Sequence, residues 1–269
     1  GMSATDLVID IGNTRLKWAL ARDGELLAGS HQALANGDEL PLAQWQALQP
    51  RRVALASVAG TTIDGPAGES VGVQTAARIG AALGCPVLQP LSQKHWRGLV
   101  CAYDDPAQFG IDRWLALLAA WQRQPDATVL VVSAGTALTV DVLAGQGRQA
   151  RHRGGLIAPG LQAMHQGLLV AAPALARYPG GQARMTLADN SADAIASGCL
   201  QAALGLIEAV RRRCADRPVP VLLAGGDGDR LQPHLPPPVQ RLPALVLEGL
   251  ARWLHEQPLD HGSDWLGVR

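Results

Sequence analysis

The pattern of apolar and polar positions predicts the same small arrangement twice, a strand that leads through a polar turn into a second strand. In the first copy, residues 7–20, the turn falls at Gly12-Asn13 and apolar residues alternate with polar ones after it. In the second copy, residues 128–142, the turn falls at residues 133–136. Further strand and helix signals follow each copy, so we expect two related α/β halves rather than one doubly wound sheet.

An amphipathic helix lies between the two copies and indicates where one half ends. Residues 113–122 carry apolar side chains at helical spacing, and Pro125 stops the helix soon afterwards. We therefore expect an N-terminal half at residues 2–124 and a C-terminal half at residues 125–269.

Three further elements are predicted in the second half. A helix is expected from about Leu161, and the Ala-rich residues 192–213 predict a long helix. Residues 219–223 predict a buried strand that ends at Gly225-Gly226. Glycines at that point suit the close passage of an adenosine moiety, and an ordinary strand-to-helix turn explains them equally well.

Composition narrows the class of protein. The chain has 269 residues, 48% hydrophobic and 17% charged, which is enough apolar material for one large core or two adjoining cores. Lys plus Arg and Asp plus Glu number 23 each, so no net field favours nucleic acid or an anionic membrane. No uninterrupted apolar stretch is long enough to span a bilayer. We expect a cytoplasmic enzyme that binds neither nucleic acid nor membrane.

The cysteines and histidines give no sign of a metal or redox centre. The four cysteines are scattered without a C-x-x-C pair, which fits reduced thiols in a cytosol. The seven histidines, His152 among them, lack metal-ligand spacing. We assign them surface or structural roles.

The first turn has the parts of a phosphate site. Gly12, Asn13 and Thr14 put backbone amides where no bulky side chain blocks a phosphate. Asp10 at the strand end can hold a magnesium ion through water, and Lys17 can reach a terminal phosphate. Taken alone, the same residues also fit a hairpin turn with an Asn-stabilised bend.

The second turn offers a similar set of donors. The Gly135 amide can approach an oxyanion closely, and Thr136 can donate its hydroxyl. An ordinary hairpin remains the alternative. Two such turns in two related halves would grip one triphosphate from both sides, which favours a nucleotide.

A carboxylate and a guanidinium stand side by side at the start of the predicted helix. Asp112 can take the proton of a substrate hydroxyl while that oxygen attacks a γ-phosphorus, and Arg113 can fix an anionic acceptor. A helix-capping role for Asp112 is an equally good local explanation.

These segments together resemble those of type III pantothenate kinases, members of the superfamily of acetate kinase, sugar kinases, Hsp70 and actin. The resemblance covers nearly the whole chain and is specific because the motifs occur in this order. The matching segments are DIGNTRLK (residues 10–17), YDDPAQFGIDRW (residues 103–114), SAGTALTVD (residues 133–141), GGLIAPGLQAM (residues 154–164) and NSADAIASG (residues 190–198).

The resemblance implies a fold and an activity. The expected fold is α/β, with two ribonuclease H-like (actin-like ATPase) halves, mixed sheets flanked by helices and an ATP cleft between the halves. The implied reaction phosphorylates pantothenate to 4′-phosphopantothenate, the first step of coenzyme A biosynthesis. The family's general base corresponds to Asp112, and its ATP-contacting threonine to Thr136. The implied pantothenate site consists of Tyr103, Gly110, Ile111, Asp112, Arg113 and Ser191.

Cofactors and assembly also follow from the resemblance. The family needs magnesium and a monovalent cation, K⁺ or NH₄⁺, and forms a homodimer whose acceptor site lies at the subunit interface. Ser133 stands where most members have the cation-binding Asp, and a neutral hydroxyl coordinates potassium more weakly, so we expect a weaker dependence on the cation. Ser191 replaces the usual Thr and keeps the hydroxyl that contacts pantothenate from the partner subunit.

Two other functions fit the sequence. The first is a nucleotide-binding accessory or regulatory protein with weak catalysis, for which Ser133 is the support. The second is a kinase of another small alcohol, since a fold does not fix its substrate.

Overall fold

The chain forms two compact units. The computed structural model describes residues 5–35, 38–58, 71–215 and 219–259. Unit 1 comprises the chain up to Lys94, the segment Tyr103–Gln122 and the chain from Ala244 onwards, while unit 2 comprises His95–Ala102 and Arg123–Pro243. The units therefore differ from the expected halves in three segments: residues 95–102 and 123–124 join the later unit, and the C-terminal segment returns to the earlier one.

Unit 1 is built on a mixed sheet. Its strand order is β3-β2-β1-β5-β6, with β4 also paired to β2. The central strand β1 is antiparallel to β2 and parallel to β5, and every residue of β1 is buried. The strands are β1 (Asp6–Ile11), β2 (Arg15–Arg22), β3 (Glu25–Leu26), β4 (Gln32–Ala35), β5 (Val53–Ser57) and β6 (Val87–Leu88).

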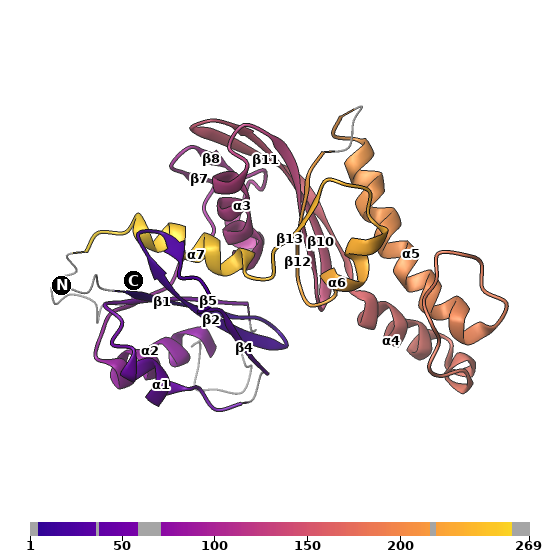
Figure 1. Cartoon of the computed structure of the whole chain (residues 1–269), viewed down its shortest axis with the longest axis horizontal. Coiled ribbons are helices and arrows are strands. Elements are labelled where there is room, and N and C mark those ends of the chain that lie inside the picture. Colours follow the sequence, from indigo (N-terminus) through magenta and orange to yellow (C-terminus); the bar gives the residue numbers. More distant parts are fainter. Residues whose placement is uncertain (1–4, 36–37, 59–70, 216–218, 260–269) are drawn as a thin grey trace. The chain divides into compact units, whose positions relative to one another are not determined.

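Helices cover both faces of this sheet (Figure 1). Helices α1 (Leu42–Ala47) and α2 (Val71–Leu83) pack together on one face, and α7 (Leu245–His255) packs against β1, β2 and β5 on the other. The return of α7 explains why the C-terminal segment belongs to unit 1, since its apolar side is buried in this unit.

Helix α7 also crosses α3 (Ile111–Arg123) at very short range. A Cβ on Gly249 would lie 1.9 Å from the Leu115 carbonyl oxygen, so only glycine permits the crossing. Arg252 donates to the Leu118 carbonyl at 2.8 Å, and its guanidinium lies 4.6 Å from the ring centre of Trp121. These contacts fix the helix that carries Asp112.

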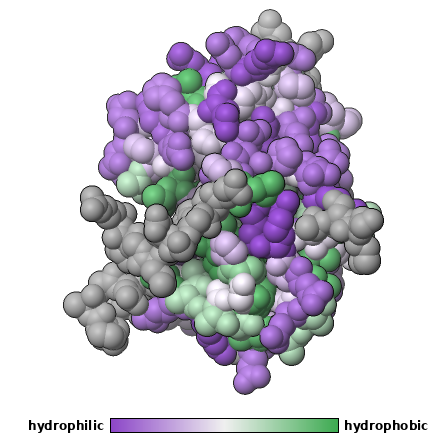
Figure 2. Space-filling model, turned by 90° about the vertical axis from the view of Figure 1, so that its left-hand side faces the viewer, coloured by the Kyte–Doolittle hydropathy of each residue, from purple (hydrophilic) through white to green (hydrophobic). Residues whose placement is uncertain are grey.

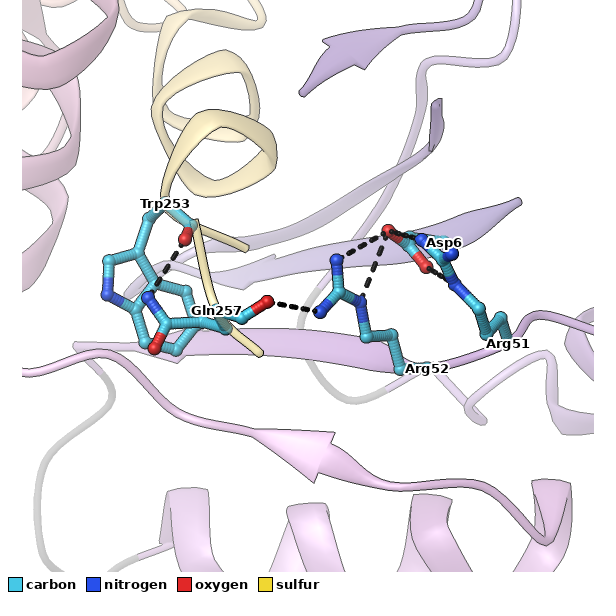
Figure 3. A network of polar contacts seen from close by, with 5 residues as sticks. All are labelled: Asp6, Arg51, Arg52, Trp253 and Gln257. Carbon is cyan, nitrogen blue, oxygen red and sulfur yellow. Dashed lines mark hydrogen bonds and ion pairs between the residues drawn. The ribbon is translucent and has the colours of Figure 1, made fainter. Parts of the chain in front are cut away.

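A polar network fastens the end of α7 to the sheet (Figure 3). Asp6 accepts two hydrogen bonds from Arg51, at 3.1 and 3.0 Å, and the buried Arg52 also donates to it at 3.3 Å. Arg52 reaches the Gln257 carbonyl at 3.1 Å, and the Gln257 amide donates to Trp253. Strands β1 and β5 and the C-terminus of α7 are thereby joined through one buried carboxylate.

Unit 2 contains a second mixed sheet, in the order β13-β12-β9-β10-β11-β8-β7. Strands β9, β10 and β11 form an antiparallel meander, and β12 and β13 run parallel to β9. The strands are β7 (His95–Trp96), β8 (Leu99–Val100), β9 (Thr128–Ala134), β10 (Ala137–Gln146), β11 (Gln149–Pro159), β12 (Val221–Ala224) and β13 (Val239–Arg241). Residues 95–102 belong to this unit because β8 pairs with β11.

The helices of unit 2 pack around this sheet, as Figure 1 shows for α5 and α6. They are α4 (Leu161–Ala171), α5 (Ser191–Arg212) and the short α6 (Gly228–Leu231), and 3₁₀ turns lie at η1 (Pro106–Gln108) in unit 1 and at η2 (Pro173–Arg177) and η3 (Gln232–His234) in unit 2. Leu200, Leu204 and Ile207 of α5 pack into the core with strand residues of β9, β10 and β12.

Helix α5 is long and apolar enough, by length and composition alone, to cross a membrane. The sequence prediction had recognised no such stretch. Because the apolar side of α5 lies in the core of unit 2 and the helix also buries Asp193 and Arg211, we interpret it as a core helix.

On the face drawn in Figure 2, hydrophilic residues are mixed with smaller apolar areas.

Most elements with a strong local pattern are confirmed. Both hairpins, the helix after Ile111, the helix from Leu161 and the long Ala-rich helix lie where they were predicted. The mixed α/β architecture with two mixed sheets flanked by helices is confirmed as well. Strand β11 was not predicted from the sequence; it includes the glycine-rich residues before Leu161 and pairs with β10 over the whole length of that strand.

Candidate active site

The first predicted turn lies at the carboxyl end of the central strand of unit 1. The hairpin closes with a hydrogen bond from the Gly12 amide to the Arg15 carbonyl at 2.9 Å. Asp10 stands directly opposite Lys17 in the antiparallel register, which places both side chains on the same face of the sheet. Asn13 and Thr14 are exposed at the tip of the turn.

Asp10 is a buried carboxyl group in an unfavourable environment. Its pKa is raised to about 7, chiefly by burial and next by the nearby charge of Asp112, while Lys17 acts in the opposite direction. Its Oδ1 atom is buried and has no hydrogen-bond partner among the described residues. A cation beside this oxygen would stabilise the buried negative charge and would give the oxygen a partner. The residues therefore fit a magnesium ion.

Protein ligands for such an ion are few. Within residues 5–35, 38–58, 71–215 and 219–259, no three His, Cys, Asp or Glu side chains gather as a metal cluster. Magnesium commonly keeps several waters and binds through one or two carboxylates together with substrate phosphates. Asp10, with Asp112 close enough to affect its pKa, matches that mode.

The acceptor segment predicted at residues 103–113 is held rigidly. Asp105 caps the η1 turn by accepting from the Ala107 amide at 3.0 Å. Ser92 donates to the carbonyl of the buried Phe109 at 2.7 Å, and the Trp114 indole donates to the Gln93 carbonyl at 3.2 Å. The segment therefore enters α3 in a fixed direction.

Asp112 lies in the first turn of α3, as the second helical residue. The helix begins at Ile111, so of the two positions that the helix-start alternative allowed, N-cap or first turn, Asp112 occupies the first turn. A Cβ on Gly110 would lie 2.8 Å from Asp112 Oδ1, which means that the glycine leaves room for this carboxylate. A carboxylate in the first turn is also stabilised by the helix dipole.

Arg113 is buried and oriented by two aromatic rings. Its Nη1 donates to the Tyr103 hydroxyl at 3.3 Å, and its guanidinium carbon lies 4.6 Å from the ring centre of Phe109 and 5.7 Å from that of Tyr103. The tyrosine and phenylalanine rings are themselves 4.9 Å apart. The structure thus places Tyr103, Gly110, Asp112 and Arg113 in one assembly.

The second predicted turn is enclosed by two other glycine-containing segments of unit 2. The Gly160 amide donates to the Thr136 carbonyl at 3.0 Å, and a Cβ on Gly160 would lie 1.9 Å from the Gly135 carbonyl oxygen. On the other side, the Asp227 amide donates to the Ala134 carbonyl at 2.9 Å. Thr136 remains exposed.

Ser133 and Ser191 are placed by separate elements of unit 2. Ser133 lies near the end of β9, where it pairs with Thr139 of β10 and Ala224 of β12. Ser191 is the first residue of α5, directly after the N-cap Asn190.

A buried acid that was not predicted from the sequence joins the start of α5 to the segment before it. Asp193 accepts from the Gln182 amide at 2.7 Å and from Asn190 Nδ2 at 3.0 Å, and it forms an ion pair with Arg184. The Gln182 hydrogen bond is the main reason why the pKa of Asp193 is lowered. Asn190 at an N-cap is recognisable from sequence, but the other partners of Asp193, Gln182 and Arg184, are not local.

His152 has the structural role that was predicted for it. It is buried, and its Nε2 lies 2.9 Å from Asp141 Oδ1. The Ala102 amide donates to the other ring nitrogen at 3.3 Å, and the Cys101 sulfur is 3.6 Å from it. The imidazole thus ties the end of β8 to β10.

Comparison with known proteins places this arrangement in a family. The family described as type III pantothenate kinase matches residues 6–213. Curated type III pantothenate kinases from Cupriavidus pinatubonensis and Laribacter hongkongensis are 37% and 39% identical, over 93% and 91% of this chain and 98% and 96% of their own lengths. One from Xanthomonas campestris is 39% identical over 93% of this chain and 97% of its own.

Solved structures support the fold. A protein from Campylobacter jejuni, described as a Baf family transcriptional activator, aligns with a TM-score of 0.56 at 18% identity, over 93% of this chain and 98% of its own. The activator of 2-hydroxyisocaproyl-CoA dehydratase from Clostridium difficile aligns with a TM-score of 0.50 at 12% identity, over 94% of each chain. The expected actin-like ATPase fold is confirmed. With its motifs and nearly its full length matched, the chain belongs to the type III pantothenate kinase family, whose members are phosphotransferases.

Proposed function

We propose that this protein transfers the γ-phosphoryl group of ATP to the hydroxyl of pantothenate in the cytoplasm. The product, 4′-phosphopantothenate, starts coenzyme A biosynthesis. The observation that carries the proposal is the assembly of Asp112 and Arg113, with a carboxylate in the first turn of α3 directly beside an oriented guanidinium.

Asp112 is the proposed general base. Its carboxylate accepts the hydroxyl proton of pantothenate as that oxygen forms a bond to the γ-phosphorus, and the bond from phosphorus to the ADP oxygen breaks. Arg113, held by Tyr103, binds the carboxylate of pantothenate. Gly110 and Ile111 complete the acceptor segment in unit 1.

Each unit contributes its own proposed nucleotide residues. In unit 1 they are Asp10, Gly12, Asn13, Thr14 and Lys17, and in unit 2 they are Gly135 and Thr136. Asp10 would hold magnesium through water, and a bound magnesium ion would neutralise charge on the nucleotide phosphates. Burial of Asp10 with an unpartnered oxygen supports this assignment.

The proposal includes a homodimer. Most large apolar side chains that are exposed among the described residues fall between residues 156 and 187. They include Val170 at 81% and Leu187 at 96% exposure. Helix α4 contacts both η2 and α5, so this apolar surface adjoins the helix that begins at Ser191. A second copy bound there would bring the Ser191 hydroxyl to the partner's acceptor site.

The direct test is phosphorylation of pantothenate by wild type and by Asp112→Asn. We expect the variant to lose two or more orders of magnitude in kcat, because the amide cannot accept the proton, and to bind nucleotide as before. Asp104→Asn is the matched control, since Asp104 lies in the same segment with its side chain fully exposed. Unchanged turnover in Asp112→Asn would exclude Asp112 as base.

The same assay should be run with and without potassium. Because Ser133 supplies a hydroxyl where a carboxylate would bind the cation, we propose a weak response to K⁺ or NH₄⁺. Ser133→Asp is expected to increase that response, while Ser133→Ala leaves it small. A strong response of the wild type would contradict the proposal for Ser133.

A regulatory protein with weak catalysis is the second candidate. The Campylobacter jejuni relative of the same fold is described as a transcriptional activator, and Ser133 gives this chain one departure at a proposed cation position. ATP binding without transfer to pantothenate or to any of a panel of small alcohols would favour this candidate. Transfer to another alcohol with higher kcat/KM would instead identify a different kinase.

A further inference from the structure

The side chain of Arg241 lies under the turn that follows β12. Arg241 is the last residue of β13 and pairs with Leu223 in the parallel register. Its Nη1 donates to the Leu223 carbonyl at 3.1 Å and its Nη2 to the Gly225 carbonyl at 2.6 Å. Its Nε donates to Asp229 Oδ1 at 2.8 Å. One guanidinium thus binds both sides of the turn at residues 225–228.

The turn packs closely against this guanidinium. A Cβ on Gly228 would lie 2.6 Å from Arg241 Cζ. Gly225 has a φ of +89°, and a Cβ there would lie 2.2 Å from the Ala134 carbonyl oxygen. Gly225 is therefore required by the backbone conformation and packing, and a side chain at Gly228 would displace the Arg241 guanidinium.

The same turn is joined to the predicted ATP turn of unit 2. The Asp227 amide donates to the carbonyl of Ala134, which is the last residue of β9 and precedes Gly135 and Thr136. Arg241 does not reach those residues itself. Its contacts with residues 225–228 act on Gly135 and Thr136 through this backbone hydrogen bond and through the packing of Gly225 on Ala134.

The guanidinium also decides which groups of the turn face outward. Because Arg241 takes the carbonyls of Leu223 and Gly225, these negative dipole ends point toward the arginine. Gly226 is exposed, and a Cβ added to it would meet nothing within 4 Å. The turn therefore leaves open space at Gly226, where a flat ligand can approach the backbone.

We propose that Arg241 is a positioning residue for nucleotide binding, which holds residues 225–228 so that Gly226 receives the nucleoside end of ATP. The inference rests on the proposed function for the identity of the nucleotide. Nothing in the local sequence indicates it, because Arg241 follows the glycines by more than ten residues and reaches them only through the pairing of β13 with β12.

The test measures binding of the non-hydrolysable analogue AMPPNP, with magnesium, by titration calorimetry. Arg241→Met is expected to weaken Kd for AMPPNP about tenfold or more and to raise KM for ATP, with KM for pantothenate unchanged. Arg241→Lys should recover part of the affinity, since an ammonium can donate to these carbonyls without the planar fork. Arg230→Met is the matched control, since Arg230 is an exposed arginine of α6 whose side chain pairs with Asp227.

A second variant guards against a loss of folding in Arg241→Met. Gly226→Val adds a side chain to open space, so its melting temperature should match that of the wild type while AMPPNP binding weakens. Wild-type AMPPNP affinity in both Gly226→Val and Arg241→Lys would overturn the inference. If AMPPNP binding is weakened in these variants and the wild type does not phosphorylate pantothenate, the inference is supported and only the proposed activity is rejected. A wild type that does not bind AMPPNP would reject both.

Discussion

At the scale of single residues, Asp10 is a charged group that the fold holds at a cost in stability. Its pKa is raised from 3.8 to about 7, chiefly by burial and next by Asp112. The folded chain therefore binds this proton more tightly than the unfolded chain. The penalty is absent below about pH 4, grows as the pH rises toward 7, and is fully present above that.

Replacement of Asp10 by Asn should therefore stabilise the ligand-free protein in a pH-dependent way. We expect the gain in the free energy of unfolding to be roughly 2 kcal/mol or more larger at pH 8 than at pH 5. Urea unfolding at the two pH values measures it. Asp112→Asn should give a smaller gain of the same sign, because it removes only the neighbouring charge. An equal gain of Asp10→Asn at both pH values would contradict the raised pKa.

Residues that act together with near neighbours in the sequence were predictable. Asp112 and Arg113 are adjacent, and Asp10 and Lys17 face each other across a hairpin whose turn was recognisable. Asp193 and Arg241 were missed because their partners come from other segments, and no local pattern encodes such contacts. The sequence indicated which side chains have the chemistry for a kinase site. Contacts between segments far apart in the sequence determine which of those side chains are held in place.

At the scale of elements, helix α7 illustrates the limit of periodicity. Apolar spacing can predict that a helix has a buried side, but it does not identify the sheet that covers it. The C-terminal segment was expected in the second half, whereas α7 packs on β1, β2 and β5 of unit 1. Gly249 allows α7 to cross α3, but a glycine in the sequence does not indicate which helix packs against it.

The crossing predicts opposite effects of one substitution at two helical glycines. Gly249→Ala should destabilise the protein by several kcal/mol, because its Cβ would collide with the backbone at Leu115 and separate α3 from α7. Gly205→Ala on α5 is the control: that glycine is exposed with nothing within 4 Å, so alanine should stabilise by about 0.5–1 kcal/mol. Thermal melting measures both, and a neutral Gly249→Ala would show that the helices can separate without loss.

At the scale of the whole molecule, the prediction concerns the proposed homodimer. Leu187 is 96% exposed within the apolar region at residues 156–187, and a lone chain gains nothing from such a side chain in water. Leu187→Glu would bury a carboxylate in the interface and should shift the protein from dimer to monomer in light scattering. Leu91→Glu, at a similarly exposed leucine outside this region, should leave the mass unchanged.

The catalytic consequence separates a dimer that completes the site from one that does not. If Ser191 of the partner subunit contacts pantothenate, the monomeric Leu187→Glu should show a KM for pantothenate raised at least tenfold, with AMPPNP binding retained, because the nucleotide residues proposed here all belong to one chain. Ser191→Ala should raise the same KM while remaining dimeric. A monomeric Leu187→Glu with wild-type kinetics would mean that each chain carries a complete acceptor site, and the apolar region would then need another explanation.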